Sequence, residues 1–242
     1  QDDTPKRPEY FTMTTMYWNL DNEATNEDWE AIEKEYKEKV TNKNEHIMGS
    51  SFITHLLTDN SREVIYVQTY PTWEDIDKAA ARNSELEKEA WPDEEARNAF
   101  LDKQAAFYSD YHSDEIFATM SGAKIPAEES DKNMVVYIRK NKMAYPENGS
   151  NKEFNELRLK QVDNVYKKND VIKAYYPSVH AWGNDRRDFM EVFIIESLND
   201  LGKMFDKNSE LAQDAMTEEE GKAMSKYFKG VHSDYVYTNL KL

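Results

Sequence analysis

Four of the five histidines in this chain form two pairs that are related by similar displacements along the sequence. His55 and His180 lie 125 residues apart, and His112 and His232 lie 120 residues apart, whereas His46 has no such counterpart. A histidine titrates close to neutral pH, so it can serve as a general base, a hydrogen-bond donor or an axial ligand. The pairing therefore selects His55 and His180 as candidate catalytic residues.

The second histidine pair belongs to a repeated His-Ser-Asp motif. His112 with Asp114, and His232 with Asp234, are two residues apart and share a strand face, which predicts an imidazole–carboxylate contact in each. Such a contact can orient a catalytic histidine, or it can simply close a helix-to-strand corner. We favour the structural role and keep these four residues as secondary candidates. The intervening serine points to the opposite face, which makes a triad of adjacent residues geometrically poor.

A further motif shows that the similarity extends over the whole chain. Asn-Ser-Glu-Leu occurs at 83–86 and again at 208–211, and the same displacement of 125 residues aligns the hydrophobic patterns of the two halves. Each half is predicted to have the order β-α-β-β-α-α-β. We expect the following parts: a flexible segment over 1–9, a ferredoxin-like repeat over 10–120, a linker over 121–133 and a second ferredoxin-like repeat over 134–242.

Strand and helix signals give the elements of each half. Strands are predicted over 10–18, 51–57, 63–70 and 113–120, and over 134–140, 175–182, 188–196 and 233–240. Helices are predicted to start near Thr25, Thr72 and Pro92, and near Asn151, Ser197 and Thr217. Each half then forms a four-stranded antiparallel sheet with helices on one face. Two such sheets facing each other make a closed α+β barrel, a pseudo-dimer within one chain.

These tandem units, with polar and aromatic residues on their strands, resemble the dimeric α+β barrel superfamily over about Tyr10 to Leu240. That group includes antibiotic-biosynthesis-monooxygenase-like, NIPSNAP-like, stress-responsive and heme-binding proteins. The resemblance implies a barrel that either binds a small molecule or processes it as a cofactor-independent oxygenase or isomerase. It does not decide whether the protein is an enzyme.

Strand alternation indicates which side chains would meet a ligand. The apolar side of the third strand, with Ile65 in one half and Met190 in the other, is expected to face the helices. The opposite side would face the barrel lumen and bind the ligand through Tyr66, Gln68, Glu191 and Phe193. On the preceding strand His180 shares a face with Trp182, and we expect this face and His55 to point into the same lumen.

Composition excludes several classes of function. The formal net charge of -16 and the lack of a basic stripe argue against nucleic-acid binding. The chain has no cysteine, which removes disulfides, thiolate catalysis and sulfur-ligated metals. No metal-binding motif is present, so no metal is expected. The apolar runs are too short to span a membrane.

The leading hypothesis is a small-molecule barrel in which a lumen histidine abstracts a proton, with Tyr66 or Glu191 helping to position the substrate. One alternative is a heme-binding barrel in which a histidine is the axial ligand, and another is a non-enzymatic, exported interaction or structural protein. The chain would act as a monomeric pseudo-dimer or assemble further into a homo-oligomer. Its polar start at Gln1 favours a secreted or periplasmic protein over a cytoplasmic one.

Overall fold

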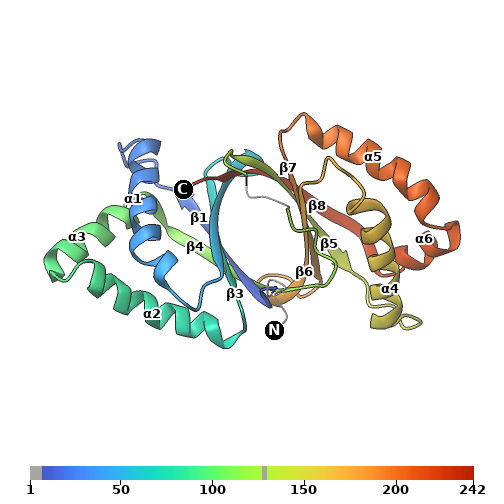
Figure 1. Ribbon diagram of the computed structural model, residues 1–242, viewed down its shortest axis with the longest axis horizontal. Coiled ribbons are helices and arrows are strands. Elements are labelled where there is room, and N and C mark those ends of the chain that lie inside the picture. Colours follow the sequence, from blue (N-terminus) through green and yellow to red (C-terminus); the bar gives the residue numbers. More distant parts are fainter. Residues whose placement is uncertain (1–6, 127–129) are drawn as a thin grey trace. The chain divides into compact units, whose positions relative to one another are not determined.

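The structure is a computed structural model that describes residues 7–126 and 130–242. The predicted flexible segment 1–9 and linker 121–133 therefore lie partly outside the described residues. The first half contains β1 (Tyr10–Trp18), α1 (Asn26–Lys39), β2 (Gly49–Leu57), β3 (Glu63–Tyr70), α2 (Glu74–Ala90), α3 (Glu94–Ala105) and β4 (Tyr108–Thr119) (Figure 1). The second half contains β5 (Met134–Met143), α4 (Asn151–Gln161), β6 (Ala174–Trp182), β7 (Asp188–Ile195), α5 (Asp200–Ala215), α6 (Glu218–Ser225) and β8 (Phe228–Leu240). A 3-10 turn at Thr41–Lys43 follows α1, and a π-helical turn at Val162–Tyr166 follows α4.

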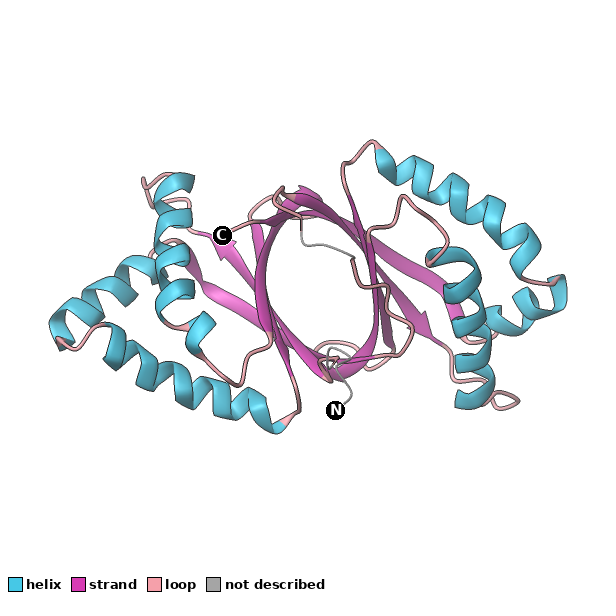
Figure 2. Ribbon diagram, in the orientation of Figure 1, coloured by secondary structure: helices cyan, strands magenta, loops and turns pink. Residues whose placement is uncertain are grey.

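Within the first half β3 pairs antiparallel with β1 and β2, and within the second half β7 pairs antiparallel with β5 and β6, while β5 also pairs antiparallel with β8. The predicted α+β class with ferredoxin-like units is confirmed, and the element order β-α-β-β-α-α-β occurs in both halves. The described residues divide into two compact units, residues 7–55, 60–116 and 240–242, and residues 56–59, 117–126 and 130–239. Within each unit the helices lie along one face of the strands (Figure 2).

The core of the first unit lies between α1 and the strands. Trp29 and Ile32 of α1 pack with Phe52 of β2 and Val64 of β3, and all four are buried. The helix begins where the sequence predicts it, because Thr25 accepts a hydrogen bond from the backbone N–H of Asp28 in a capping box. The cap sets where α1 begins, and the packing of Trp29 and Ile32 determines which side of the sheet faces the helix.

The core of the second unit is built in the same way. Val162 and Tyr166 of the π-helical turn pack against Tyr137 of β5 and Phe193 of β7, and Met204 of α5 completes the cluster. The stacked rings of Tyr137 and Phe193 have centroids 5.7 Å apart. The sequence did not predict the π-helical turn, which brings two core side chains, Val162 and Tyr166, onto the sheet.

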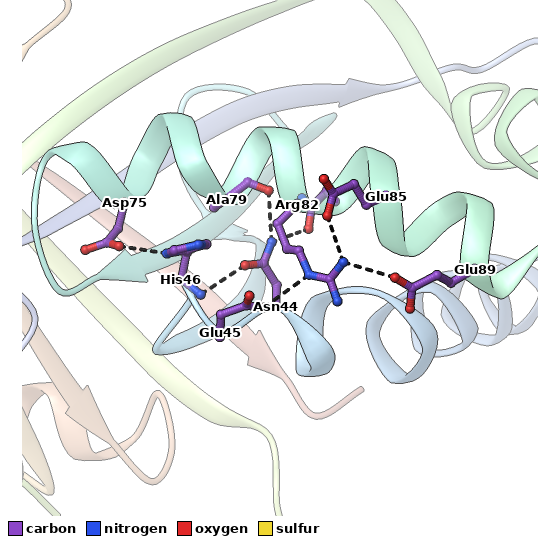
Figure 3. Close-up of polar contacts among 9 residues, drawn as sticks. Asn44, Glu45, His46, Asp75, Ala79, Arg82, Glu85 and Glu89 are labelled. Carbon is purple, nitrogen blue, oxygen red and sulfur yellow. Dashed lines mark hydrogen bonds and ion pairs between the residues drawn. The ribbon is translucent and has the colours of Figure 1, made fainter.

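The repeated Asn-Ser-Glu-Leu motif has a structural role in both halves. Asn44, buried at the end of the 3-10 turn, donates to Asn83 Oδ1 at 2.7 Å and to the carbonyl of Ala79 at 2.9 Å, and it accepts from the backbone N–H of His46 (Figure 3). Asn169 repeats these contacts: it donates to Asn208 Oδ1 at 2.8 Å. The motif asparagine is thus the partner of a buried asparagine that ties a turn to a helix.

Replacing Asn169 by Ala should lower the free energy of unfolding by about 2–3 kcal/mol, because it leaves buried polar groups without their partner. Asn169 is fully buried, donates to the carbonyl of Met204 and accepts from the N–H of Val171. Urea unfolding followed by circular dichroism measures the change, with the exposed turn variant Asn184→Ala as control. Equal stability of the two variants would contradict a role for this network in holding α5.

Candidate functional site

Each unit contains a cavity between its helices and the helix-facing side of its sheet. The first cavity, in the first unit, has a volume of about 280 Å³ and is lined by Glu33 of α1 and Tyr66 of β3. The second cavity, in the second unit, has a volume of about 330 Å³ and is lined by Arg158 of α4 and Glu191 of β7. Both pairs of residues are related by the 125-residue displacement. The two cavities therefore occupy equivalent places but carry different charges.

A row of three charged residues crosses the sheet at the second cavity. Arg139 on β5 lies directly opposite Glu191 on β7 and, on its other side, directly opposite Asp234 on β8. Cross-strand neighbours of this kind have Cβ atoms about 4.5–5.5 Å apart on the same face. Arg139 Nε donates to Asp234 Oδ1 at 3.1 Å. The strand register thus places a guanidinium between two carboxylates.

Glu191 is the buried carboxylate of this row, with only 8 % of its surface exposed. Its Oε1 accepts a hydrogen bond from Tyr175 Oη at 2.9 Å, and its Oε2 accepts one from Asn141 Nδ2 at 3.1 Å. Burial raises the pKa of Glu191 above its ordinary value, although these hydrogen bonds and the charges of Arg139 and Arg158 act in the opposite direction. The result is a carboxylate more basic than one in water.

Arg158 brings a second guanidinium to the cavity from α4 and is 2 % exposed. Its Nη1 donates to the carbonyl of Ser121 at 2.9 Å, and its Nη2 lies 3.3 Å from Ser121 Oγ. These bonds attach the segment after β4 to the helix. They also hold the positive charge close enough to act on the pKa of Glu191.

The remaining wall of the second cavity is mostly aromatic and thioether. It includes Gln161, Tyr166, Phe189, Met216, Met224 and Phe228. Cavities with apolar walls and a few convergent polar groups are typical small-molecule sites. A planar organic molecule could lie against these rings with an oxygen atom near a guanidinium and a hydrogen atom near Glu191.

The predicted imidazole–carboxylate contacts of the His-Ser-Asp motifs are present. His232 Nε2 lies 2.9 Å from Asp234 Oδ2, and His112 Nε2 lies 3.3 Å from Asp114 Oδ2. Burial acts to raise the pKa of Asp234, but hydrogen bonds from Tyr137 and Arg139 bring it below its ordinary value. His232 and Asp234 are about half exposed and flank the charged row.

In the first unit the equivalent row is neutral at its centre. Asp114 accepts a hydrogen bond from Thr14 Oγ1 at 2.7 Å, and Thr14 lies opposite Tyr66 on β3. Thr14 and Tyr66 correspond to Arg139 and Glu191 at the 125-residue displacement. The two rows thus share the His-Ser-Asp motif but differ in the residues that face the cavity.

The prediction that Glu191 and Phe193 face away from the helices is wrong. Phe193 packs with Val162 and Met204, and Glu191, two residues earlier on β7, lines a cavity beneath α4 and α6. Tyr66 likewise packs on the α1 side of its sheet, and alternation gives Gln68 the same face. Gln68 accepts a hydrogen bond from Tyr70 Oη at 3.1 Å and does not line the first cavity.

The candidate catalytic histidines lie on the other face of the sheets. Since Phe52 faces α1, alternation along β2 turns His55 away from it, and His180 is likewise turned away from the helix-packed Tyr175 on β6. Neither histidine lines either cavity among the described residues. Trp182 ends β6 with two thirds of its surface exposed. The structure therefore does not bring these three residues together with Glu191.

Sequence reasoning missed Arg139, Asn141 and Arg158. A usable signal was present, because the displacement that pairs the histidines also replaces Thr14 by Arg139 and Glu33 by Arg158. His46, which has no counterpart in the second half, has its Nδ1 2.8 Å from Asp75 Oδ1 and lies beside the asparagine network of α2 (Figure 3).

The stability difference between Glu191→Gln and the wild type should depend on pH. A raised pKa in the folded state means that the protonated glutamate contributes stability below the unfolded value, near 4.5, and that this contribution is lost as the pH rises through the folded value. The free energy of unfolding of the variant should therefore increase relative to that of the wild type between pH 4 and pH 8, by about 1.4 kcal/mol for each unit by which the folded pKa of Glu191 exceeds the unfolded one. Urea unfolding at several pH values measures this, with Glu94→Gln on the exposed side of α3 as control. A difference that does not vary with pH would contradict a raised pKa.

No protein-family model and no curated protein matches this chain. A candidate monooxygenase from Fusobacterium nucleatum subsp. nucleatum has a similar structure, with a TM-score of 0.58 and 13% identity over 96% of this chain and 92% of that one. A mutant chlorite dismutase from Candidatus Nitrospira defluvii in complex with cyanide gives a TM-score of 0.56 and 13% identity over 97% and 92% of the two chains.

A third similar structure is a candidate monooxygenase from Lactobacillus acidophilus, with a TM-score of 0.52 and 8% identity over 97% of this chain and 94% of that one. This chain shares its mixed α/β fold with these three proteins. At these identities the likeness shows the fold alone. Within the described ranges, no helix is long and apolar enough to cross a membrane, and no group of three or more His, Asp or Glu side chains could hold a metal ion.

Proposed function

We propose that the second cavity binds a small, planar organic molecule and that Glu191 removes a proton from a carbon atom next to its carbonyl group. The observation that carries this proposal is the buried carboxylate of Glu191 beside two guanidinium groups, Arg139 and Arg158, on the wall of a cavity that is also lined by aromatic and methionine side chains. Titratable groups with raised pKa values in a cavity are a frequent mark of a functional site.

The proton transfer follows from the positions of these groups. The Glu191 carboxylate takes the proton, and the electron pair of the broken C–H bond moves to the carbonyl oxygen to form an enolate. Arg139 and Arg158 stabilise the negative charge on that oxygen. If the substrate has a carbon–carbon double bond next to the carbon that loses the proton, the enolate is a dienolate, and return of the proton from Glu191 to its γ-carbon shifts the double bond into conjugation with the carbonyl group. The product is an isomer of the substrate and the carboxylate is restored, so no co-reactant is required.

A second outcome for the same carbanion is the addition of dioxygen, which would make the protein an oxygenase. The support for it is the fold shared with two bacterial proteins described as candidate monooxygenases. Fold similarity is a weaker argument than the geometry of the site. Oxygen consumption during turnover distinguishes the two outcomes, because isomerisation consumes none.

The heme alternative has less support from the residues present. Heme iron in proteins is held by an axial side chain, most often a histidine. Neither cavity has a histidine among its described lining residues, and His55 and His180 lie on the opposite face of the sheets. These residues do not fit a histidine-ligated heme in either cavity.

A pair of variants at Gly221 tests the location of the site. Gly221 lines the second cavity from α6, and a Cβ atom built there meets nothing within 4 Å. We therefore expect Gly221→Trp to obstruct the cavity, whereas Gly221→Ala should leave it open and stabilise α6 by about 0.5–1 kcal/mol.

The reaction to be measured is the opening of 5-nitrobenzisoxazole, a bicyclic probe for carboxylate bases. The base takes the C3 proton, the N–O bond breaks, and the electron pair ends on the phenolate oxygen of a yellow product. We expect turnover by the wild type and Gly221→Ala and its loss in Gly221→Trp. Equal rates for both variants would place the reacting group elsewhere, and no turnover by the wild type would contradict the proposed base.

A further inference from the structure

The first cavity is a second binding site, and we propose that it takes a small organic ammonium ion with an aromatic or apolar side group. Glu33 of α1 lies on its wall and is 4 % exposed. Around this carboxylate the cavity is lined by the rings of Tyr36, Phe52, Tyr66 and Tyr108. The proposal stands on these residues and does not depend on the reaction proposed for the second cavity.

The carboxylate of Glu33 is held by neutral donors. Tyr108 Oη donates to Oε1 at 2.7 Å, and Gln104 Nε2 donates to Oε2 at 2.9 Å. Trp29 Nε1 donates in turn to Tyr108 Oη at 2.7 Å, which fixes the direction of the tyrosine hydroxyl. A carboxylate oxygen can accept two hydrogen bonds, and Tyr108 and Gln104 supply one to each oxygen of Glu33. The carboxylate therefore keeps acceptor capacity for a ligand that enters the cavity.

A buried carboxylate is most stable with a cation beside it. Among the described residues Glu33 forms no ion pair, and burial raises its pKa above the ordinary value. Lys37, one turn further along α1, also lines the cavity, but its Nζ donates to the main-chain oxygen of Leu242 at 3.0 Å. An ammonium ion bound in the cavity would supply the countercharge and donate N–H bonds to Glu33.

The aromatic walls favour the same ligand. The rings of Phe52 and Tyr66 stack with their centroids 4.5 Å apart and line the cavity from β2 and β3. A cation over the face of such rings is attracted by their negative quadrupole, and the attraction is largest where water is excluded. The cavity volume of about 280 Å³ accommodates one ring and a short aminoalkyl chain.

The comparison of the two cavities strengthens the assignment. The helix position that carries Glu33 in the first unit carries Arg158 in the second, and the strand position that carries Tyr66 carries Glu191. The charged side chains that line the first cavity are Glu33 and Lys37, whereas those that line the second are Glu191 and two arginines, Arg139 and Arg158. We therefore expect the two sites to bind ligands of different charge.

Calorimetric titration with benzylamine tests the proposal, with benzyl alcohol as the uncharged analogue of the same shape. Wild-type protein should bind benzylamine saturably, and at least about tenfold more tightly than benzyl alcohol. Glu33→Gln keeps the shape of the side chain and should lose this preference. Equal binding of the two ligands by the wild type, or undiminished benzylamine binding by a folded Glu33→Gln, would overturn the proposal.

Two further variants keep the test decisive. Ala105 is exposed at the end of α3 and lines the cavity, so Ala105→Phe should block benzylamine without removing a buried group. Glu191→Gln should bind benzylamine as the wild type does, because it changes only the second cavity. If Ala105→Phe leaves binding unchanged, or if Glu191→Gln abolishes it, the amine is not bound at Glu33. Failure of 5-nitrobenzisoxazole turnover in the wild type would leave this result unaffected.

Discussion

Glu191→Gln is expected to lower the rate of 5-nitrobenzisoxazole opening by about 10²–10⁴-fold, the usual contribution of a positioned general base. Glutamine has the shape of glutamate and can keep the hydrogen bonds of Tyr175 Oη and Asn141 Nδ2 in part, but its amide accepts no proton. The wild-type rate should rise with pH as Glu191 loses its proton, with a midpoint above the ordinary glutamate pKa because burial raises that pKa. Absorbance of the phenolate product measures the rate.

Glu33→Gln is the matched control for this experiment, because it also neutralises a buried carboxylate in a cavity. The first cavity has no guanidinium among its described lining residues, and the Nζ of Lys37 on its wall donates to the main-chain oxygen of Leu242, so the control should keep most of the wild-type rate. A comparable loss in both variants, or no loss in Glu191→Gln, would contradict the assignment of Glu191 as the base.

Arg158→Met is expected to lower the free energy of unfolding by about 3–5 kcal/mol, the usual effect of removing one member of a buried charged cluster. Methionine fills much of the space but donates nothing to Ser121, and it withdraws a positive charge that acts on Glu191. Urea unfolding at pH 7 measures the loss. Because the charge of Arg158 lowers the pKa of Glu191, the pH–rate midpoint of a folded variant should also move upward.

Arg187→Met provides the comparison for Arg158→Met. The Arg187 side chain is 49% exposed, its Nη2 lies 2.7 Å from Asp185 Oδ2, and its ion pair should contribute only about 0–1 kcal/mol. Similar stability losses in the two variants would show that Arg158 acts as an ordinary surface arginine, against its placement on the cavity wall.

The fold was predictable because the same pattern of elements occurs twice, so that a weak signal in one half is supported by the other. The strands expected over 10–18 and 63–70 have those bounds in the structure, and the capping box of Thr25 with Asp28 is present. The strands 134–140 and 233–240 are longer than predicted, at Met134–Met143 and Phe228–Leu240. Charged and polar residues at the ends of these two strands carry no clear alternation.

The face of each strand that packs against the helices was harder to predict, because both faces of the sheet bury apolar side chains. Val64 and Ile65 are adjacent on β3 and both are almost fully buried, so the apolar side of the strand could not be identified from its composition. The helix-facing side of β7 is instead the one that carries Glu191, which is stabilised there by Tyr175 and Asn141. A buried glutamate on a helix-facing strand position contradicts the usual pattern and marks the site.

The candidate site was only partly predictable for the same reason. Glu191 was named as a helper residue and Asp234 as a secondary candidate, whereas the structure places both beside Arg139 in one cross-strand row. The comparison of histidine positions between the two halves selected residues that both halves have in common. The chemistry proposed here depends instead on positions where the halves differ, such as Thr14 and Arg139. The row becomes visible only when the pairing register of strands that lie far apart in the sequence is known.

The most direct test of the central claim is to locate a bound molecule with methyl NMR of the methionines. Met216 and Met224 line the second cavity and Met16 lines the first, so each cavity has its own reporter. With protein labelled at the methionine methyl carbons, we titrate 2-cyano-4-nitrophenol, the product of the probe reaction. The account predicts saturable shifts of the Met216 and Met224 signals with Met16 unchanged. Saturable binding that leaves Met216 and Met224 unshifted would contradict it.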